Sequence, residues 1–226
     1  MIHATAPWLA PLAPWLPLPL TDVAAALNAH DGAPRHFVPQ AELPEGEAYE
    51  AFIARTGRVP TRDNLHDAFN GLQWLAQPAI KARLNALQAQ SLASHGVQAQ
   101  RGPLRDALTL FDENGAFWPD CPAPIAAAWA QRDWPAMFIT HRALWADSRP
   151  QLFGHALLEQ LHAQPRKGLC AHVLLADPLR LRPGEWAAKP FLPLPVLGVP
   201  GWWPPNAQPG FYDDPAVFRP LRTPAA

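Results

Sequence analysis

Proline most tightly constrains what this chain can fold into. The sequence contains 29 prolines in 226 residues. Each proline fixes its own φ and removes a backbone N–H donor, so helix interiors and central strands exclude it. Five prolines fall within the first twenty residues, and ten fall between Pro183 and Pro220. We therefore expect the regular elements to lie mainly between these two regions.

The predicted architecture is a single compact, mainly α domain of α+β type with a few short strands. It has an extended N-terminal strap over residues 1–20, a mainly helical core over residues 21–182, and a proline- and aromatic-rich C-terminal wrap over residues 183–226. Proline-rich composition is typical of disorder. Here the aromatic side chains carry too much apolar area to remain in water, so we expect this wrap to be ordered.

Composition excludes several classes of protein. The chain has 18 basic and 19 acidic residues, so it lacks the positive field that would hold a phosphate backbone, and nucleic acid is not an expected partner. The apolar N-terminus lacks a basic segment, and its prolines would break a signal or membrane helix. We expect no membrane span and a cytoplasmic location. Two cysteines, Cys121 and Cys170, are too few for a disulfide framework; reduced thiols are the favoured interpretation, and pairing stays open.

Periodicity and capping residues predict the elements of the core. Helices are expected over residues 22–29, 47–56, 63–76, 79–94, 124–132, 135–145 and 149–163, with Gly57 and Gly96 ending two of them. Strands are expected at HFVP from His36 and at CAHVLLA from Cys170. Residues 105–118 fit either a hairpin turn at Asn114–Gly115 or a helix that ends at Gly115.

The stretch TRDNLHDAFNGLQW, residues 61–74, contains the first candidate site. At about 100° per residue, His66 and Asn70 point to the same side of the predicted helix, with Asp67 beside them. An imidazole with an amide and a carboxylate nearby can orient water, accept a proton or ligate a metal. The alternative is a solvated polar face without a specific role.

The stretch FGHALLEQLH, residues 153–162, contains the second candidate site. His155, Glu159 and His162 are spaced i, i+4 and i+7, which aligns them along one stripe of a helix, as metal ligands on a helix require. This spacing differs from that of an HExxH motif. The acidic pairs Asp112–Glu113 and Asp213–Asp214 would bind a cation or share a proton if held together, although adjacent carboxylates are usually just solvated.

Other motifs are absent from the sequence. It contains no GxxxxGK[ST], GxGxxG or GxSxG, so a P-loop, a dinucleotide fold and a hydrolase nucleophile elbow have no support. An HD phosphohydrolase pattern can be fitted to His36, His66–Asp67 and Asp112. With nine histidines in the chain, such a match arises easily by chance.

Several strings occur together in one order: TRDNLHDAFNGLQW, KARLN, RDALTLFDENG, FGHALLE, LGVPGW and FYDDPAVFRP. As a set they resemble the proteobacterial domain-of-unknown-function family 3025, over nearly the whole chain after the strap. The resemblance implies a single domain of bacterial, non-secreted type, and it implies no activity. It also suggests that the strings form one constellation.

Two alternative functions are consistent with this set of residues. The first is a small binding or scaffolding domain whose polar pocket takes a small anion or a protein partner. The alternative is a metal-dependent hydrolase of an anionic, phosphoester-like substrate, with a divalent metal bound by His66, His155 and Glu159. Its expected catalytic residues are His66, Asp67, Asp112 and Glu113, and its expected substrate-binding residues are Arg62, Asn70, Lys81 and Arg105. The two hypotheses differ in whether His66, His155 and a carboxylate converge within ligand reach of one point.

Overall fold

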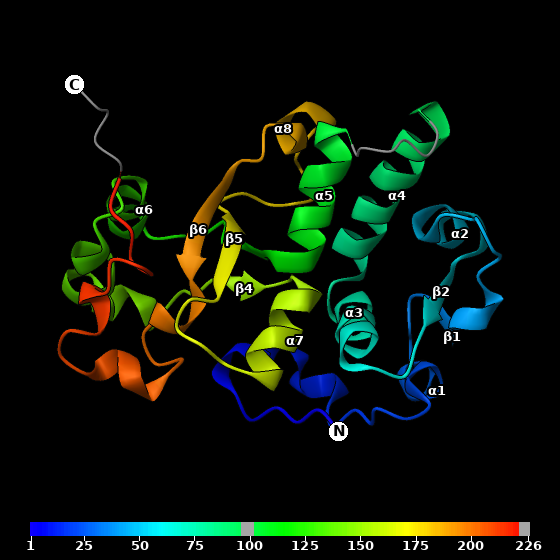
Figure 1. Ribbon diagram of the computed structural model, residues 1–226, viewed down its shortest axis with the longest axis horizontal. Helices are drawn as coiled ribbons and strands as arrows, with labels where there is room; N and C mark the ends of the chain where they lie inside the picture. The colour runs from blue at the N-terminus through cyan, green and yellow to red at the C-terminus, as the bar shows by residue number, and fades with distance from the viewer. Residues whose placement is uncertain (96–101, 222–226) are drawn as a thin grey trace.

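A computed structural model describes residues 1–95 and 102–221 and is mainly helical with two small sheets (Figure 1). This agrees with the predicted α+β class. The helices are α1 (Val23–Asn28), α2 (Tyr49–Thr56), α3 (Leu65–Ala76), α4 (Pro78–His95), α5 (Pro103–Asn114), α6 (Ala123–Ala130), α7 (His155–Ala163) and α8 (Pro183–Ala187). The strands are β1 (His36–Pro39), β2 (Arg58–Thr61), β3 (Gly115–Phe117), β4 (Gln151–Leu152), β5 (Cys170–Leu174) and β6 (Phe191–Pro195).

The larger sheet has the strand order β4-β3-β5-β6. β3 is parallel to β5, and the two outer pairs are antiparallel. β6 contains Pro193 and Pro195, which is tolerated because β6 is an edge strand and needs donors on one side only. The smaller sheet is the parallel pair of β1 and β2.

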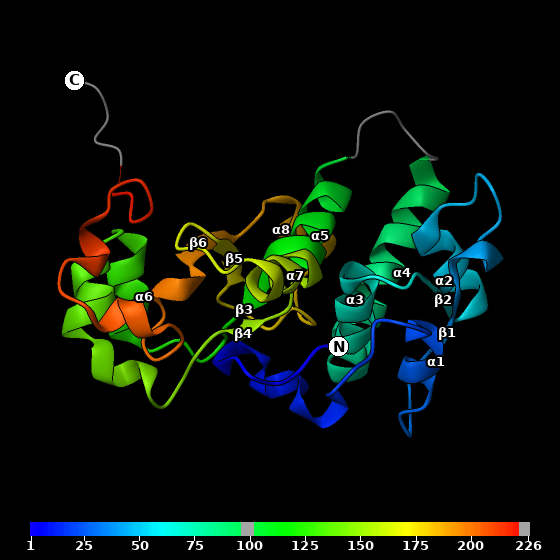
Figure 2. The same ribbon diagram turned by 60° about the horizontal axis from the view of Figure 1, so that its bottom comes forward.

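Four helices fill the middle of the molecule. α3 packs against α7 and α4, and α5 packs against α4 and α7 (Figures 1 and 2). The larger sheet lies between these helices and α6, while α1, α2 and the smaller sheet flank α3 and α4 on the other side (Figure 1). The predicted helical hairpin of residues 63–76 and 79–94 therefore forms, and its expected end at Gly96 lies outside the described residues.

Two predicted helices differ from the structure, and one open alternative is decided. The helix expected over residues 149–163 begins only at His155, because Gln151–Leu152 pairs with β3 as strand β4. Of the two alternatives for residues 105–118, the helix that ends at Gly115 is confirmed and the hairpin turn at Asn114–Gly115 does not form: α5 continues to Asn114, and Gly115 opens β3. The helix expected over residues 135–145 is a π-helical turn, Ala136–Thr140, followed by the 3-10 helix Arg142–Trp145.

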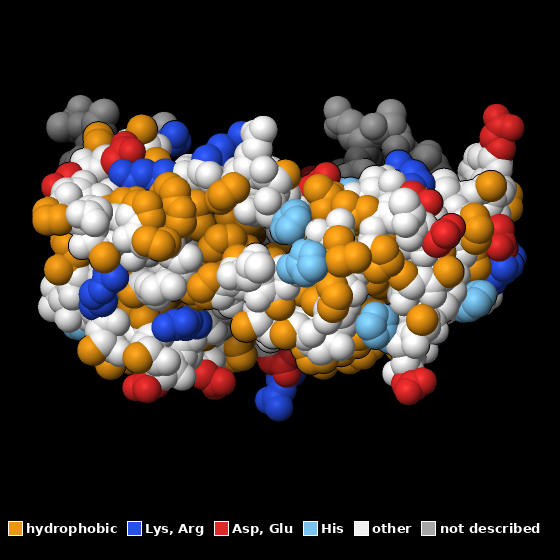
Figure 3. Space-filling model, turned by 90° about the horizontal axis from the view of Figure 1, so that it is seen from below, with side chains coloured by type: hydrophobic (Ala, Val, Ile, Leu, Met, Phe, Trp, Pro, Cys, Tyr) orange, Lys and Arg blue, Asp and Glu red, His pale blue; other side chains and the backbone are white. Residues whose placement is uncertain are grey.

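The N-terminal segment is not the extended strap that was predicted. Pro7–Trp15 forms a 3-10 helix. Proline fits this helix because the φ angle of a 3-10 helix, like that of an extended polyproline backbone, is close to the value that the proline ring fixes. Trp8, Leu9 and Leu12 are buried, and a bridge between Ile2 and Leu18 brings the segment back on itself. The segment runs below α3 and α7 (Figures 1 and 2). Hydrophobic side chains cover much of the face seen from below, with histidines among them (Figure 3).

The C-terminal region contributes an aromatic cluster to the core. The Tyr212 ring stacks on Phe138, and the Tyr212 hydroxyl donates to the carbonyl of Gly198. Trp134 donates through Nε1 to the carbonyl of Arg219. Cys121 and Cys170 are both free thiols. None of the helices in the described residues combines the length and the apolar composition needed to cross a membrane.

Candidate functional site

The start of α3 is fixed by a polar anchor. Asn64 caps the helix by accepting a hydrogen bond from the backbone N–H of Asp67 at 2.8 Å. The Asp67 carboxylate accepts from the backbone N–H of Arg62 at 2.7 Å and from its guanidinium Nε and Nη2 at 3.0 and 2.9 Å. Both carboxylate oxygens of Asp67 are therefore bonded to Arg62. Asp67 was expected to be catalytic and Arg62 to bind substrate. In the structure the two side chains pair with each other.

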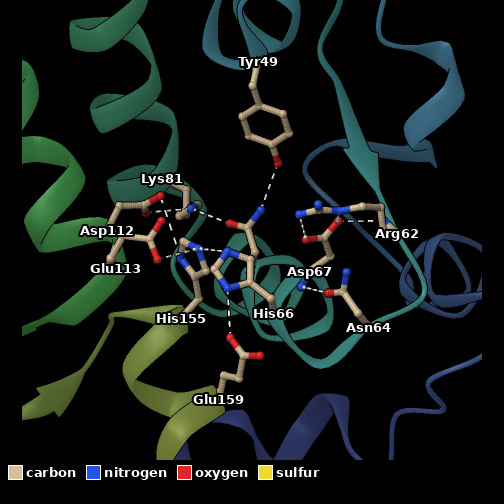
Figure 4. A network of polar contacts seen from close by, with 11 residues as sticks. Tyr49, Arg62, Asn64, His66, Asp67, Lys81, Asp112, Glu113, His155 and Glu159 are labelled. Atoms are coloured by element: carbon tan, nitrogen blue, oxygen red, sulfur yellow. Dashed lines mark hydrogen bonds and ion pairs between the residues drawn. The ribbon is translucent and has the colours of Figure 1, made fainter. Parts of the chain in front are cut away.

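A buried hydrogen-bonded chain runs from α2 across α3 and α4 to α5 (Figure 4). The ammonium of Lys81, which is 4% exposed, donates to Asn70 Oδ1 at 2.7 Å and to Asp112 Oδ1 at 2.6 Å. Asn70 donates through Nδ2 to the Tyr49 hydroxyl at 2.9 Å. Burial pushes the pKa of Asp112 upward, but the charge and hydrogen bond of Lys81, together with the nearby His155 and His66, hold that pKa below its usual range. Asp112 is therefore anionic at neutral pH.

The structure brings His66 of α3 and His155 of α7 together. Their Nε2 atoms lie 3.1 Å apart, and their rings meet edge to face (Figure 4). Nδ1 of His66 lies 2.9 Å from Oε2 of Glu159. A carboxylate only accepts, so in the neutral ring the proton of His66 is on Nδ1 and its Nε2 carries a lone pair. It follows that His155 donates from its own Nε2.

This arrangement leaves one polar atom of His155 unsatisfied. Its Nδ1 is buried and makes no hydrogen bond of normal geometry within residues 1–95 and 102–221; Oδ2 of Asp112 is 3.8 Å away, and the backbone of Asp112 also interacts with the ring and raises its pKa. Burial lowers the pKa of His155 to about 4, so the ring is neutral at pH 7. With its proton on Nε2, the ring presents a lone pair to an anionic carboxylate. That contact is unfavourable.

Gly154 lets α5 and α7 approach closely enough to place a carboxylate beside this pair. A Cβ at Gly154 would lie 2.5 Å from both Cα of Asn114 and the carbonyl oxygen of Glu113. The backbone N–H of Gly154 donates to the carbonyl of Gly115 at 2.8 Å. As a result, Oε2 of Glu113 lies 3.5 Å from Nε2 of His155.

The ligand atoms of His66, Glu113 and His155 all lie within 4.8 Å of one another. A tetrahedral ion with bonds of about 2.0–2.1 Å to nitrogen would separate two ligand nitrogens by about 3.3 Å, and a right-angled pair by about 2.9 Å. The 3.1 Å between the histidines falls in this range. Glu113 completes the group in place of Glu159, which bonds to the outer nitrogen of His66 instead.

A cavity of about 300 Å³ opens beside the cluster. Its lining includes His66, Glu113 and His155 together with Gln40, Leu43, Tyr49, Glu50, Arg62, Asp67, Asn70, Gln88, Thr109 and Asp112. Of the expected site residues, Arg105, Glu159 and Lys81 are not in this lining, although Lys81 bonds to the lining residues Asn70 and Asp112.

Sequence reasoning missed six of these lining residues: Gln40, Leu43, Tyr49, Glu50, Gln88 and Thr109. A signal was present for Gln88, because it continues the spacing of Lys81 and Asn85 at i, i+4 and i+7 on α4, and all three are buried. Tyr49 and Glu50 come from α2, and no pattern in the sequence relates α2 to α3 and α5.

The remaining sequence candidates lie away from the cluster. His162 packs against the ring of Phe69, and Asp214 pairs with Lys167. His36 lines a separate cavity along β1, so the HD phosphohydrolase pattern does not assemble around His66.

Comparison with known protein families finds one matching family model, described as "Protein of unknown function (DUF3025)", over residues 35–185 and 175–222. Together the two matched ranges contain every residue of the cluster and of the cavity lining. No curated protein and no solved structure matches the chain.

Proposed function

Because the chain belongs to the DUF3025 family, whose description assigns no chemistry, we propose its function from the site alone: a metal-dependent hydrolase. His66, His155 and Glu113 hold one divalent cation, and the cation activates a water molecule that faces the cavity. The observation that carries the proposal is the pair of Nε2 atoms 3.1 Å apart, with the buried Nδ1 of His155 left without a hydrogen bond among the described residues.

A bound cation accounts for that unsatisfied atom. To ligate through Nε2, His155 must carry its proton on Nδ1, where it faces the carboxylate of Asp112. His66 already has the tautomer that ligation through Nε2 requires, since Glu159 accepts a hydrogen bond from its Nδ1. Each ligand histidine would then have a carboxylate behind it, which is the usual second shell of a metal-bound imidazole. Lys81 supports this by keeping Asp112 anionic.

The charge of the site also favours a cation. Among the described residues, four carboxylates line the cavity, those of Glu50, Asp67, Asp112 and Glu113. Asp67 pairs with Arg62, and Asp112 pairs with Lys81. A divalent ion would be attracted to this group of carboxylates.

The ligand set matches catalytic rather than structural metal sites. Three protein ligands of the His, His, carboxylate type leave a coordination position for water, whereas structural zinc sites use four protein ligands. An ion such as Zn²⁺ lowers the pKa of its bound water to about 7, so hydroxide forms at neutral pH.

The test is metal binding by the full chain after treatment with chelator. Isothermal titration with Zn²⁺ and Mn²⁺, together with elemental analysis, should show about one ion per chain. His66→Ala, His155→Ala and Glu113→Gln should each abolish binding or weaken it at least about 10-fold. His162→Ala is the matched control, because His162 is on the same helix as His155 but outside the ligand group. Equal binding by wild type and His66→Ala would refute the proposal.

A non-catalytic binding domain is the second candidate. The chain from Tyr49 through Asn70 and Lys81 to Asp112 is hydrogen-bonded without any ligand, and it forms a rigid polar wall for the cavity. Such a domain would bind its ligand equally well in the presence of chelator. A ligand that binds only to metal-loaded protein would exclude this alternative.

A further inference from the structure

We infer that the chain has a second ligand site, beside the edge strand β6, where Arg132 and Arg219 bind the phosphate group of a small organic phosphate. A cavity of about 310 Å³ opens there between the end of α6, the strands β5 and β6, and the C-terminal segment (Figure 1). Among the residues that the structure describes, it shares none with the cavity beside His66. The inference is therefore independent of the proposed metal site.

The lining of this second cavity combines positive charge with apolar surface. Arg132 and Arg219 contribute two guanidinium groups, which bind phosphate oxygens through paired N–H donors. A phosphate monoester carries close to two negative charges at neutral pH, so two guanidiniums match its charge. Apolar contact for the organic part of the ligand comes from Trp134, Pro193, Pro195 and Val217.

Hydrogen bonds fix Arg219 at one side of the cavity. Trp134 donates through Nε1 to the carbonyl of Arg219 at 2.8 Å, and Arg219 donates through Nε to the carbonyl of Ala216 at 3.0 Å. Its Nη1 and Nη2 atoms make no hydrogen bond within residues 1–95 and 102–221. A guanidinium held by its Nε keeps most of its donors for a ligand and loses less freedom when it binds one.

Arg132 occupies a position where helices normally have glycine. α6 ends in a Schellman motif, in which the N–H of Arg132 donates to the carbonyl of Trp129 at 2.9 Å. The next N–H, that of Asp133, donates to the carbonyl of Ala128 at 2.9 Å. This motif holds Arg132 in the left-handed region at φ 50°. Glycine adopts that conformation without a steric penalty and arginine does not, so the arginine side chain is retained at a cost in strain.

Cys170 leaves the positive charge of the two arginines in place. Its half-buried side chain lines the same cavity. Burial raises the pKa of Cys170 to about 11, although Arg132 and Arg219 both act to lower it. The sulfur is therefore a neutral thiol at pH 7, and it lies within electrostatic reach of both guanidiniums. A ligand bound by the two arginines would lie beside this thiol, so Cys170 can report on occupancy.

The alternative is that Arg132 serves α6 alone, because a cation beside the C-terminal end of a helix is stabilising. Arg132→Gly separates the two roles. Glycine suits the left-handed position, so the variant should unfold at the same temperature as wild type or higher. Its loss of ligand binding would then not come from a loss of fold.

The test measures binding of phenyl phosphate by the full chain in chelator, so that no metal contributes. Calorimetric titration should show one site per chain, with weaker binding of inorganic phosphate, which lacks the apolar part, and none of benzyl alcohol, which lacks the charge. Arg132→Gly and Arg219→Met should each weaken the binding of phenyl phosphate at least about 10-fold. Arg180→Met is the control, because Arg180 has an 87% exposed side chain outside this lining, and it should bind like wild type.

The reaction of Cys170 with N-ethylmaleimide locates the bound ligand. In a chain whose other thiol is removed by Cys121→Ser, phenyl phosphate should slow this reaction, and the concentration that halves the extent of protection should equal the Kd from calorimetry. Absence of saturable binding at millimolar concentrations would overturn the inference. Binding that neither arginine substitution weakens, or binding that leaves the rate at Cys170 unchanged, would overturn it equally.

Discussion

Gly154→Ala tests whether the close approach of α7 to α5 builds the site. The new Cβ would lie 2.5 Å from Asn114 Cα and from the carbonyl oxygen of Glu113, and 2.6 Å from the backbone nitrogen of Asn114. Ordinary contact begins at 3.4 Å. All three neighbours are backbone atoms, so a side-chain rotation cannot relieve the clash. The start of α7 must move away from α5 by nearly an ångström.

The cost follows from this displacement. Overpacking costs about 1–3 kcal/mol, and stretching the 2.8 Å hydrogen bond from Gly154 to Gly115 adds about 1 kcal/mol. We therefore expect the free energy of unfolding to fall by about 2–4 kcal/mol. The same movement would widen the 3.5 Å separation between His155 and Glu113 to about 4.4 Å. Two ligands of one ion lie only about 3.4 Å apart, so zinc affinity should fall as well.

Urea unfolding in chelator measures the first effect, and zinc titration measures the second. Gly184→Ala is the matched control, because its Cβ would meet no atom within 4 Å and alanine is the better helix former in α8. It should leave stability unchanged or raise it by up to about 1 kcal/mol. If Gly154→Ala unfolds like wild type, the approach is not tight. If it is destabilised yet binds zinc normally, this contact does not position Glu113.

Three further predictions follow from the buried contacts. Lys81→Met should cost about 3–5 kcal/mol in urea unfolding, because it leaves the Asp112 carboxylate without its counter-ion; a second change, Asp112→Asn, should restore part of the loss, and purely additive losses would contradict the pairing. Because burial lowers the pKa of His155 to about 4, the unfolded chain takes up this proton first as the pH falls. Stability measured in chelator should therefore be full above pH 6.5 and decline towards pH 4, by at most about 1.4 kcal/mol per pH unit for this residue; an unchanged profile in His155→Gln would argue against a buried neutral imidazole. Asn64→Ala should lower stability by about 1 kcal/mol through loss of the α3 cap, with zinc binding retained, as thermal unfolding and titration would show.

Local chemistry made much of the fold predictable. Gly57 ends α2 in the left-handed region at φ 70°, as glycine after a periodic stretch predicts. The apolar run from Cys170 forms β5. The errors arose where pairing with distant residues decided the outcome. Residues Gln151 and Leu152 fit a helical pattern, but they form a strand because β3 offers them a partner. Phe191–Pro195 contains two prolines and still pairs with β5, which no local rule anticipates.

The candidate site was predictable only in part, for the same reason. Helical spacing identified His66 and His155 separately, and their residue types suggested that they could meet. The choice between Glu113 and Glu159 as the third member depends on the approach of α5 to α7 at Gly154, which the spacing within α7 does not contain. Gln88 and Tyr49 line the cavity because α4 and α2 pack beside it. Neither residue is close to either histidine in the sequence.

The contact between His66 and His155 also sets an order of events during synthesis. The two residues are 89 positions apart. At about 5–20 residues per second on the ribosome, roughly 4–18 s pass between the appearance of the first and the second. During that interval α3 and its polar side chains have emerged without α7 to cover them. The site is therefore completed late, and a nascent chain that stalls before residue 155 exposes a half-built surface to chaperones and proteases.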